Sequence, residues 1–95
     1  DENMITTCIT DSSIFFPEDA EGTVSVFSAG DEARGVTERG LKYSLTNADL
    51  TNDYPIGVSN SFKGAASKIT VKNGSLFVVF PIEAKCRIVF EGGKR

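Results

Sequence analysis

The chain has 95 residues, which is room for one small domain (residues 1–95) and not for two. Its hydrophobic share of 40% and charged share of 24% are typical of a globular domain rather than of a disordered segment. The formal net charge of −3 argues against nucleic-acid binding, and the absence of histidine excludes Ser–His and Cys–His nucleophile pairs.

Charge is distributed unevenly along the chain. Residues 1–55 carry a formal charge of −8, whereas residues 56–95 carry +5. Two interpretations follow: acidic and basic strands neighbour each other on one mixed surface, or an acidic face and a basic face meet between copies of the chain. The first is favoured, because sandwich topologies place early and late strands side by side.

The first third of the chain predicts three strands. Met4–Thr10 is rich in Thr and Ile, and Ser13–Phe16 ends at Pro17. In Thr23–Val26 the valines alternate with polar residues, which is the pattern of a half-buried strand.

The middle of the chain predicts more loop than strand. Ala29–Gly40 carries three glycines among charges, so we expect a long loop there with at most one helical turn. Leu41–Thr46 alternates and predicts a strand, whereas Asn47–Tyr54 is an Asn/Asp/Thr-rich loop that leads to a proline.

Strand patterns return in the last third, after a small and flexible stretch at Ser61–Ser67. Lys68–Lys72 alternates, and Asn73–Gly74 after it predicts a hairpin, since a type I′ turn needs positive φ at both central residues. Leu76–Phe80 is apolar on both faces and predicts a central, fully covered strand. Lys85–Phe90 predicts the last strand.

These patterns give about seven to eight short strands with turn signals about every 8–12 residues. The sequence therefore predicts an all-β fold, a small antiparallel β-sandwich of Ig-like or Greek-key type, with a small β-barrel as the alternative. Its longest apolar stretch, Leu76–Phe80, is far shorter than the ~20 residues of a membrane-spanning helix, so no membrane insertion is expected.

The two cysteines lie near opposite ends of the chain. Cys8 falls in the first predicted strand and Cys86 in the last, which favours one disulfide in a small β domain. Such a bond implies an oxidising compartment. The alternative is two free thiols. One detail favours this alternative: Cys8 alternates with Ile9, so the two side chains point to opposite faces of the predicted strand.

No set of residues predicts catalysis or a cofactor. A pair of carboxylates could serve glycoside hydrolysis, but the sugar-binding clefts of such enzymes are usually lined by aromatic residues. This chain has no Trp, so the pair is weak evidence for a hydrolase. Asp49, Asn52 and Asp53 form the best calcium candidate, although their spacing does not fit an EF-hand and solvated turns explain them as well.

Four side chains are candidates for contact with a protein partner, and another copy of the chain is one such partner. Phe16 precedes a proline and Phe62 stands in a polar loop, so either side chain is a candidate exposed anchor, with the core as the alternative. Lys63 and Lys68 flank the same small, basic loop.

The leading functional hypothesis is a non-enzymatic module, secreted or at the cell surface, such as a filament or surface subunit or an adhesin-type domain. The alternative is a small secreted effector: a hydrolase or protease inhibitor, or one chain of a processed toxin, which the dibasic end Lys94–Arg95 would fit. Both hypotheses rest on the strand pattern, the cysteine pair and the missing histidine.

Overall fold

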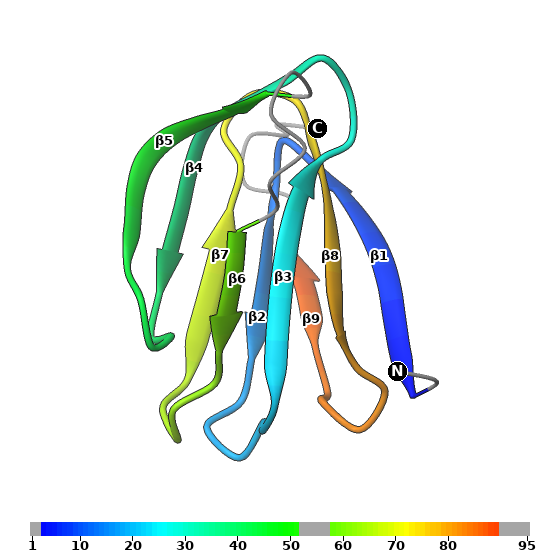
Figure 1. Ribbon diagram of the computed structural model, residues 1–95, viewed down its shortest axis with the longest axis vertical. Helices are drawn as coiled ribbons and strands as arrows, with labels where there is room; N and C mark the ends of the chain where they lie inside the picture. Colours follow the sequence, from blue (N-terminus) through cyan, green and yellow to red (C-terminus); the bar gives the residue numbers. More distant parts are fainter. Residues whose placement is uncertain (1–2, 52–57, 90–95) are drawn as a thin grey trace.

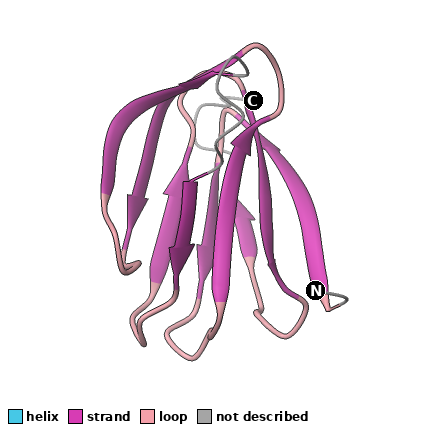
Figure 2. Ribbon diagram, in the orientation of Figure 1, coloured by secondary structure: helices cyan, strands magenta, loops and turns pink. Residues whose placement is uncertain are grey.

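The computed structural model describes residues 3–51 and 58–89 of the chain, and within these ranges it contains strands and no helix (Figure 2). No helix in the described part is therefore long and apolar enough to cross a membrane. The strands are β1 (Met4–Thr10), β2 (Ser13–Phe16), β3 (Thr23–Ser28), β4 (Glu32–Arg39), β5 (Leu45–Thr51), β6 (Val58–Ser61), β7 (Ser67–Thr70), β8 (Ser75–Pro81) and β9 (Arg87–Val89).

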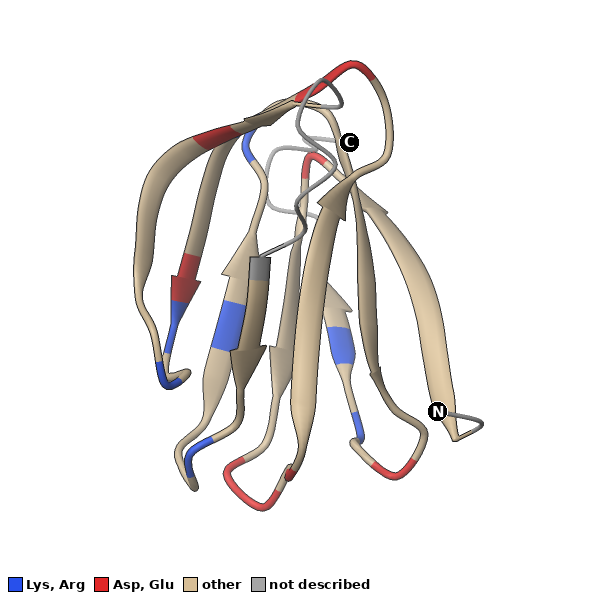
Figure 3. Ribbon diagram, viewed as in Figure 1, with Lys and Arg blue, Asp and Glu red and all other residues tan. Residues whose placement is uncertain are grey.

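The strands form two antiparallel sheets that face each other (Figure 1). The four-stranded sheet has the order β1-β8-β3-β6, and the five-stranded sheet has the order β5-β4-β7-β2-β9. The prediction of an all-β fold with two antiparallel sheets is therefore confirmed. Early and late strands neighbour each other in both sheets, so the acidic and basic halves of the chain intermingle (Figure 3).

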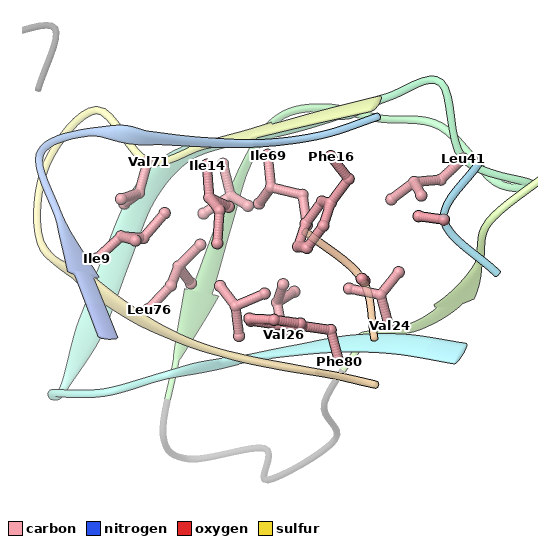
Figure 4. Packing of buried hydrophobic residues seen from close by; sticks show 14 of the residues in the cluster. Ile9, Ile14, Phe16, Val24, Val26, Leu41, Ile69, Val71, Leu76 and Phe80 are labelled. Carbon is pink, nitrogen blue, oxygen red and sulfur yellow. The ribbon is translucent and has the colours of Figure 1, made fainter. Parts of the chain in front are cut away.

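The core fills the space between the two sheets (Figure 4). Strand alternation turns one apolar face of each sheet inward, as Ile14 and Phe16 of β2 and Val24 and Val26 of β3 illustrate. Phe16 is 2% exposed, and its ring lies edge-on to those of Phe62 and Phe80, with both centroids 5.0 Å away. These aromatic contacts join the five-stranded sheet to the four-stranded sheet.

The Asn73–Gly74 hairpin prediction is wrong. The strands on either side, β7 and β8, belong to different sheets, so the chain crosses between sheets at this point. Long-range contacts hold the crossing in place: Arg34 N donates to Asn73 O at 2.8 Å, and Gly74 N donates to Asp11 Oδ1 at 2.9 Å. Local turn chemistry alone does not reveal these contacts.

Two further expectations need correction. The segment predicted as a long loop, Ala29–Gly40, contains the eight-residue strand β4. The strand predicted to be covered on both faces, β8, is central in its sheet but leaves Phe77 41% exposed, because no layer covers the outer face there in the described part.

The predicted disulfide between Cys8 and Cys86 is also wrong. Both residues are exposed free cysteines. Cys8 lies on β1 of the four-stranded sheet and alternates with the buried Ile9, so its side chain points away from the core. Cys86 directly precedes β9 at an edge of the five-stranded sheet, so the two thiols lie on different layers of the sandwich.

Candidate functional site

A short segment between β4 and β5 joins the two sheets at one end of the sandwich. Gly40 directly follows β4 and has a φ of 79°, a left-handed conformation that suits glycine. The next residue, Leu41, is buried and forms an isolated bridge with Phe62. Lys42 N then donates to Ser61 O at 2.9 Å, which docks the segment on the end of β6.

The side chain of Asn60, on β6, holds this segment in place with hydrogen bonds. Asn60 Oδ1 accepts hydrogen bonds from Tyr43 N at 2.9 Å and from Ser61 N at 3.0 Å. Asn60 Nδ2 donates to Tyr43 O at 2.7 Å and to Glu38 Oε1 at 2.8 Å. The amide is 4% exposed, so its four hydrogen bonds replace the water that burial removes.

A buried carboxyl group, that of Glu38 on β4, supports the amide in turn. Glu38 is 1% exposed, and its Oε2 atom has no hydrogen-bond partner among the described residues. Burial raises the pKa of Glu38 above its ordinary value, and the hydrogen bond from Asn60 offsets part of this rise. An ionised carboxylate at this position is therefore unfavourable for folding, as is common at functional sites.

Replacing this carboxyl group, Glu38→Gln, is expected to raise the stability of the fold at pH 7. A carboxyl whose pKa is raised on folding contributes stability below its unfolded pKa, and this contribution is lost as the pH rises through the folded pKa. The gain from the neutral amide should therefore be largest at pH 7 and should shrink as the pH falls toward 4.5, the ordinary value. Urea unfolding at both pH values measures it, and an equal difference at both would contradict the assignment.

The network ends in an exposed aromatic side chain. Tyr43 is 60% exposed, although its backbone N–H and C=O are both held by Asn60. The Lys42 ammonium lies 5.5 Å from the centroid of the Tyr43 ring. A rigid backbone thus presents an aromatic ring to the solvent, which is an arrangement suited to binding a planar or cationic ligand.

The four predicted partner residues do not form one surface. Phe16 lies in the core, so the prediction that it is an exposed anchor is wrong. Phe62 is half-buried and packs against Phe16. Lys63 is exposed in the loop after β6, while Lys68 is on β7 with its Nζ 5.3 Å from the centroid of Phe15.

The calcium candidate falls largely outside the described residues. Asn52 and Asp53 are not described, and Asp49 Oδ1 accepts a hydrogen bond from Gly35 N at 3.2 Å. Within the described ranges, no group of three metal-ligating side chains comes together.

Sequence reasoning missed the residues of this network. Glu38 lies in the segment predicted as a loop, and no sequence pattern singled out Asn60. The sequence around Tyr43 offers one local pattern: in Gly40–Leu41–Lys42–Tyr43 an aromatic residue stands three positions after a glycine. This pattern indicates a site only once the structure shows that β6 lies beside the segment.

Solved structures with the same fold come from thiamin pyrophosphokinases. The structure from Geobacillus thermodenitrificans matches with a TM-score of 0.75 at 20% identity, covering 82% of this chain and 37% of that one. The structure from Bacillus subtilis matches with a TM-score of 0.72 at 15% identity over 87% of this chain and 39% of that one. A family protein from Enterococcus faecalis gives 0.67 at 24% identity, over 85% and 38%.

The chain therefore spans less than two fifths of the length of these structures. No curated protein matches the chain significantly. A family model described as "Thiamin pyrophosphokinase, vitamin B1 binding domain" matches residues 11–76, which include Glu38, Tyr43 and Asn60.

This match overturns the functional hypotheses drawn from the sequence. A non-enzymatic structural or surface module is wrong, because the matching family is a domain of an enzyme. The prediction of a secreted or cell-surface chain is wrong as well, since it depended on a disulfide that the two free cysteines do not form. The chain belongs to the family of thiamin pyrophosphokinase vitamin B1 binding domains.

Proposed function

We propose that this chain binds thiamin and serves as the thiamin-binding domain of a thiamin pyrophosphokinase. The observation that carries the proposal is the family match over residues 11–76, a range that contains the whole Glu38–Asn60–Tyr43 network. The protein partner expected from the sequence would then be the remainder of the enzyme. The groups that transfer the pyrophosphate would lie there, since the matched structures extend far beyond this chain.

The chemistry of thiamin fits the exposed aromatic ring. Thiamin has two planar rings, an aminopyrimidine and a positively charged thiazolium. Either ring can stack on an aromatic side chain, and a cation gains additional attraction from the electron-rich face of a tyrosine. Tyr43 is the aromatic side chain that this network holds in place, so we assign it the role of stacking on the ligand.

The other residues of the network position Tyr43 rather than touch the ligand. Asn60 and Glu38 are buried, so neither presents a polar atom to solvent. Their role is to hold the backbone of Tyr43 in one conformation, which lowers the entropy that ligand binding must otherwise cost.

Replacing the ring, Tyr43→Ala, is expected to weaken thiamin binding about tenfold, which corresponds to the loss of one stacking or cation–π contact. Tyr43→Phe keeps the ring and should stay within about threefold of the original affinity. Isothermal titration calorimetry of thiamin into the chain measures both.

The matched control is Phe27→Ala, which removes an exposed ring from the outer face of the four-stranded sheet. It should leave thiamin affinity unchanged. Equal affinity for Tyr43→Ala and the original chain would contradict the assignment of Tyr43.

A further inference from the structure

A groove beside the start of β9 lies apart from the Tyr43 network. Its volume is about 690 Å³, within the range of small-molecule sites, and none of Glu38, Tyr43 and Asn60 lines it. One of the two free cysteines, Cys86, lines the groove and is exposed. The groove therefore combines a space of ligand size with a side chain that can form a covalent bond.

Positive charge surrounds this cysteine. Lys85 and Arg87 flank Cys86 in the chain, and Arg39 on β4 lines the groove with them. Figure 3 shows basic positions on β9 and just before it. These three cations are exposed, and no carboxylate in the described ranges lies within ion-pair distance of them. The lining includes one carboxylate, that of Asp19, so the local charge is positive and should attract anions.

Two details of the lining indicate a polar ligand. The Arg87 guanidinium carbon lies 4.9 Å from the centroid of Phe15, a cation–π contact that leaves the N–H donors of Arg87 for other partners. Ser67 also lines the groove, and its hydroxyl oxygen is buried with no hydrogen-bond partner among the described residues. Buried polar groups are normally hydrogen-bonded, so an unsatisfied hydroxyl group beside a groove indicates that a polar molecule binds there.

The other free cysteine has different surroundings. Cys8 lies on β1 and pairs with Phe77 of β8, and its outward neighbours along β1 are Thr6 and Thr10. None of these side chains is charged. One chain thus contains an exposed thiol beside cations and an exposed thiol beside uncharged side chains, and the second is an internal control for the first.

We propose that Cys86 is a site of reversible modification by a low-molecular-weight disulfide that carries carboxylates. The Cys86 thiolate attacks one sulfur of that disulfide, whose sulfur–sulfur bond breaks as a new one forms to Cys86. The departing half leaves as a thiolate and takes up the proton that the Cys86 thiol released. One disulfide replaces another, so the step needs no further oxidant, and a second small thiol reverses it.

The chemistry of such a molecule matches the groove. Each half of glutathione disulfide carries two carboxylates and one ammonium group, and the lining offers cations in excess together with one carboxylate. Arginine binds a carboxylate through paired hydrogen bonds, a geometry that Arg39 and Arg87 can provide. The groove shares no residue with the Tyr43 network, so modification of Cys86 and thiamin binding can be tested separately.

Modification of both cysteines in the same sample tests this assignment. The chain is treated with anionic glutathione disulfide, neutral 2-hydroxyethyl disulfide or cationic cystamine, and peptide mass spectrometry gives the rate at each cysteine. The ratio of the Cys86 rate to the Cys8 rate should be about tenfold higher for glutathione disulfide than for 2-hydroxyethyl disulfide, because the local potential concentrates anions. It should be lowest for cystamine. Added salt should reduce these differences, since it screens the charges.

Two substitutions separate recognition of the anion from simple access to the thiol. Arg39→Gln and Lys85→Gln should each lower the rate ratio for glutathione disulfide about threefold, because one attracting charge is lost. The ratio for 2-hydroxyethyl disulfide should not change. Lys63→Gln removes the same charge from an exposed lysine outside the groove and should leave both ratios unchanged.

Equilibrium in a buffer of fixed glutathione and glutathione disulfide concentrations provides a second readout. The equilibrium constant for the mixed disulfide should be about fivefold or more larger at Cys86 than at Cys8, because charged hydrogen bonds hold the attached half in the groove. Equal equilibrium constants at the two cysteines would overturn the proposal. Rate ratios that are the same for all three disulfides would also overturn it, as would an unchanged ratio in the double variant Arg39→Gln/Lys85→Gln.

Discussion

Gly40→Ala is expected to lower the free energy of unfolding by about 3 kcal/mol or more. The φ of 79° at Gly40 costs a residue with a Cβ roughly 1–2 kcal/mol. In addition, a Cβ at this position would overlap the backbone carbonyl oxygen of Ala66, which a side-chain rotation cannot relieve. The backbone must therefore shift where β4 leads into residues 41–44. This shift should lower the free energy of unfolding further, as overpacking of a core does. Urea unfolding of the variant measures the loss.

Two other glycines separate the causes of this loss. Gly64→Ala has a similar φ of 83° but meets open space, so it should show the conformational cost alone. Gly30→Ala meets open space at an ordinary φ and should be nearly neutral. A loss at Gly40 no larger than that at Gly64 would contradict the close approach to Ala66.

Asn60→Ala is expected to lower the free energy of unfolding by about 2–4 kcal/mol. The substitution leaves the N–H and C=O of Tyr43 and the carboxyl group of Glu38 without a partner in a buried setting. Each unsatisfied buried group costs roughly 1–3 kcal/mol, partly relieved by water that enters the space. Chemical unfolding measures the loss, and thiamin affinity should fall with it.

The isosteric change Asn60→Asp tests the role of the amide donor. It replaces Nδ2 with an oxygen 2.8 Å from Glu38 Oε1, so two carboxyl groups would face each other. The variant should be less stable than Asn60→Ala at pH 7 and should recover as acid protonates one of the pair. Asn73→Ala, at an exposed asparagine, should stay within about 0.5 kcal/mol of the original chain. A pH-independent loss in Asn60→Asp would contradict the contact with Glu38.

The sequence was sufficient to predict the fold class because strand alternation is a local signal. Val24 and Val26 predicted the inward face of β3, and both are buried. The pairing of strands is a long-range property, so it was predicted less well. Asn73–Gly74 reads as a hairpin from its own chemistry, but contacts with Arg34 and Asp11 place it between sheets.

β4 was missed for a similar reason. Its glycines and charges resemble a loop, yet Gly35 has a φ of 66° at a register shift between Ala33 and Val36. A bulge of this kind lets a glycine interrupt a strand without ending it. Glu38 was missed with it, because a carboxyl group at a core position contradicts the alternation that identifies strands.

The prediction of a non-enzymatic module was wrong for a different reason. The missing histidine excludes histidine-based catalysis within this chain, but this inference concerns only the groups that the chain itself contains. It gives no ground for excluding that the chain belongs to a family of enzyme domains. Residues 17 positions apart, Tyr43 and Asn60, come together only through the docking of the 41–44 segment on β6, which no local pattern predicts.

The proposal that thiamin binds at the segment held by Asn60 can be tested by titrating the ¹⁵N-labelled chain with thiamin and recording amide NMR spectra. We expect concentration-dependent shifts concentrated at Lys42, Tyr43, Asn60 and Ser61, which share the hydrogen-bond network. Shifts confined to other parts of the chain, or none at millimolar thiamin, would contradict it.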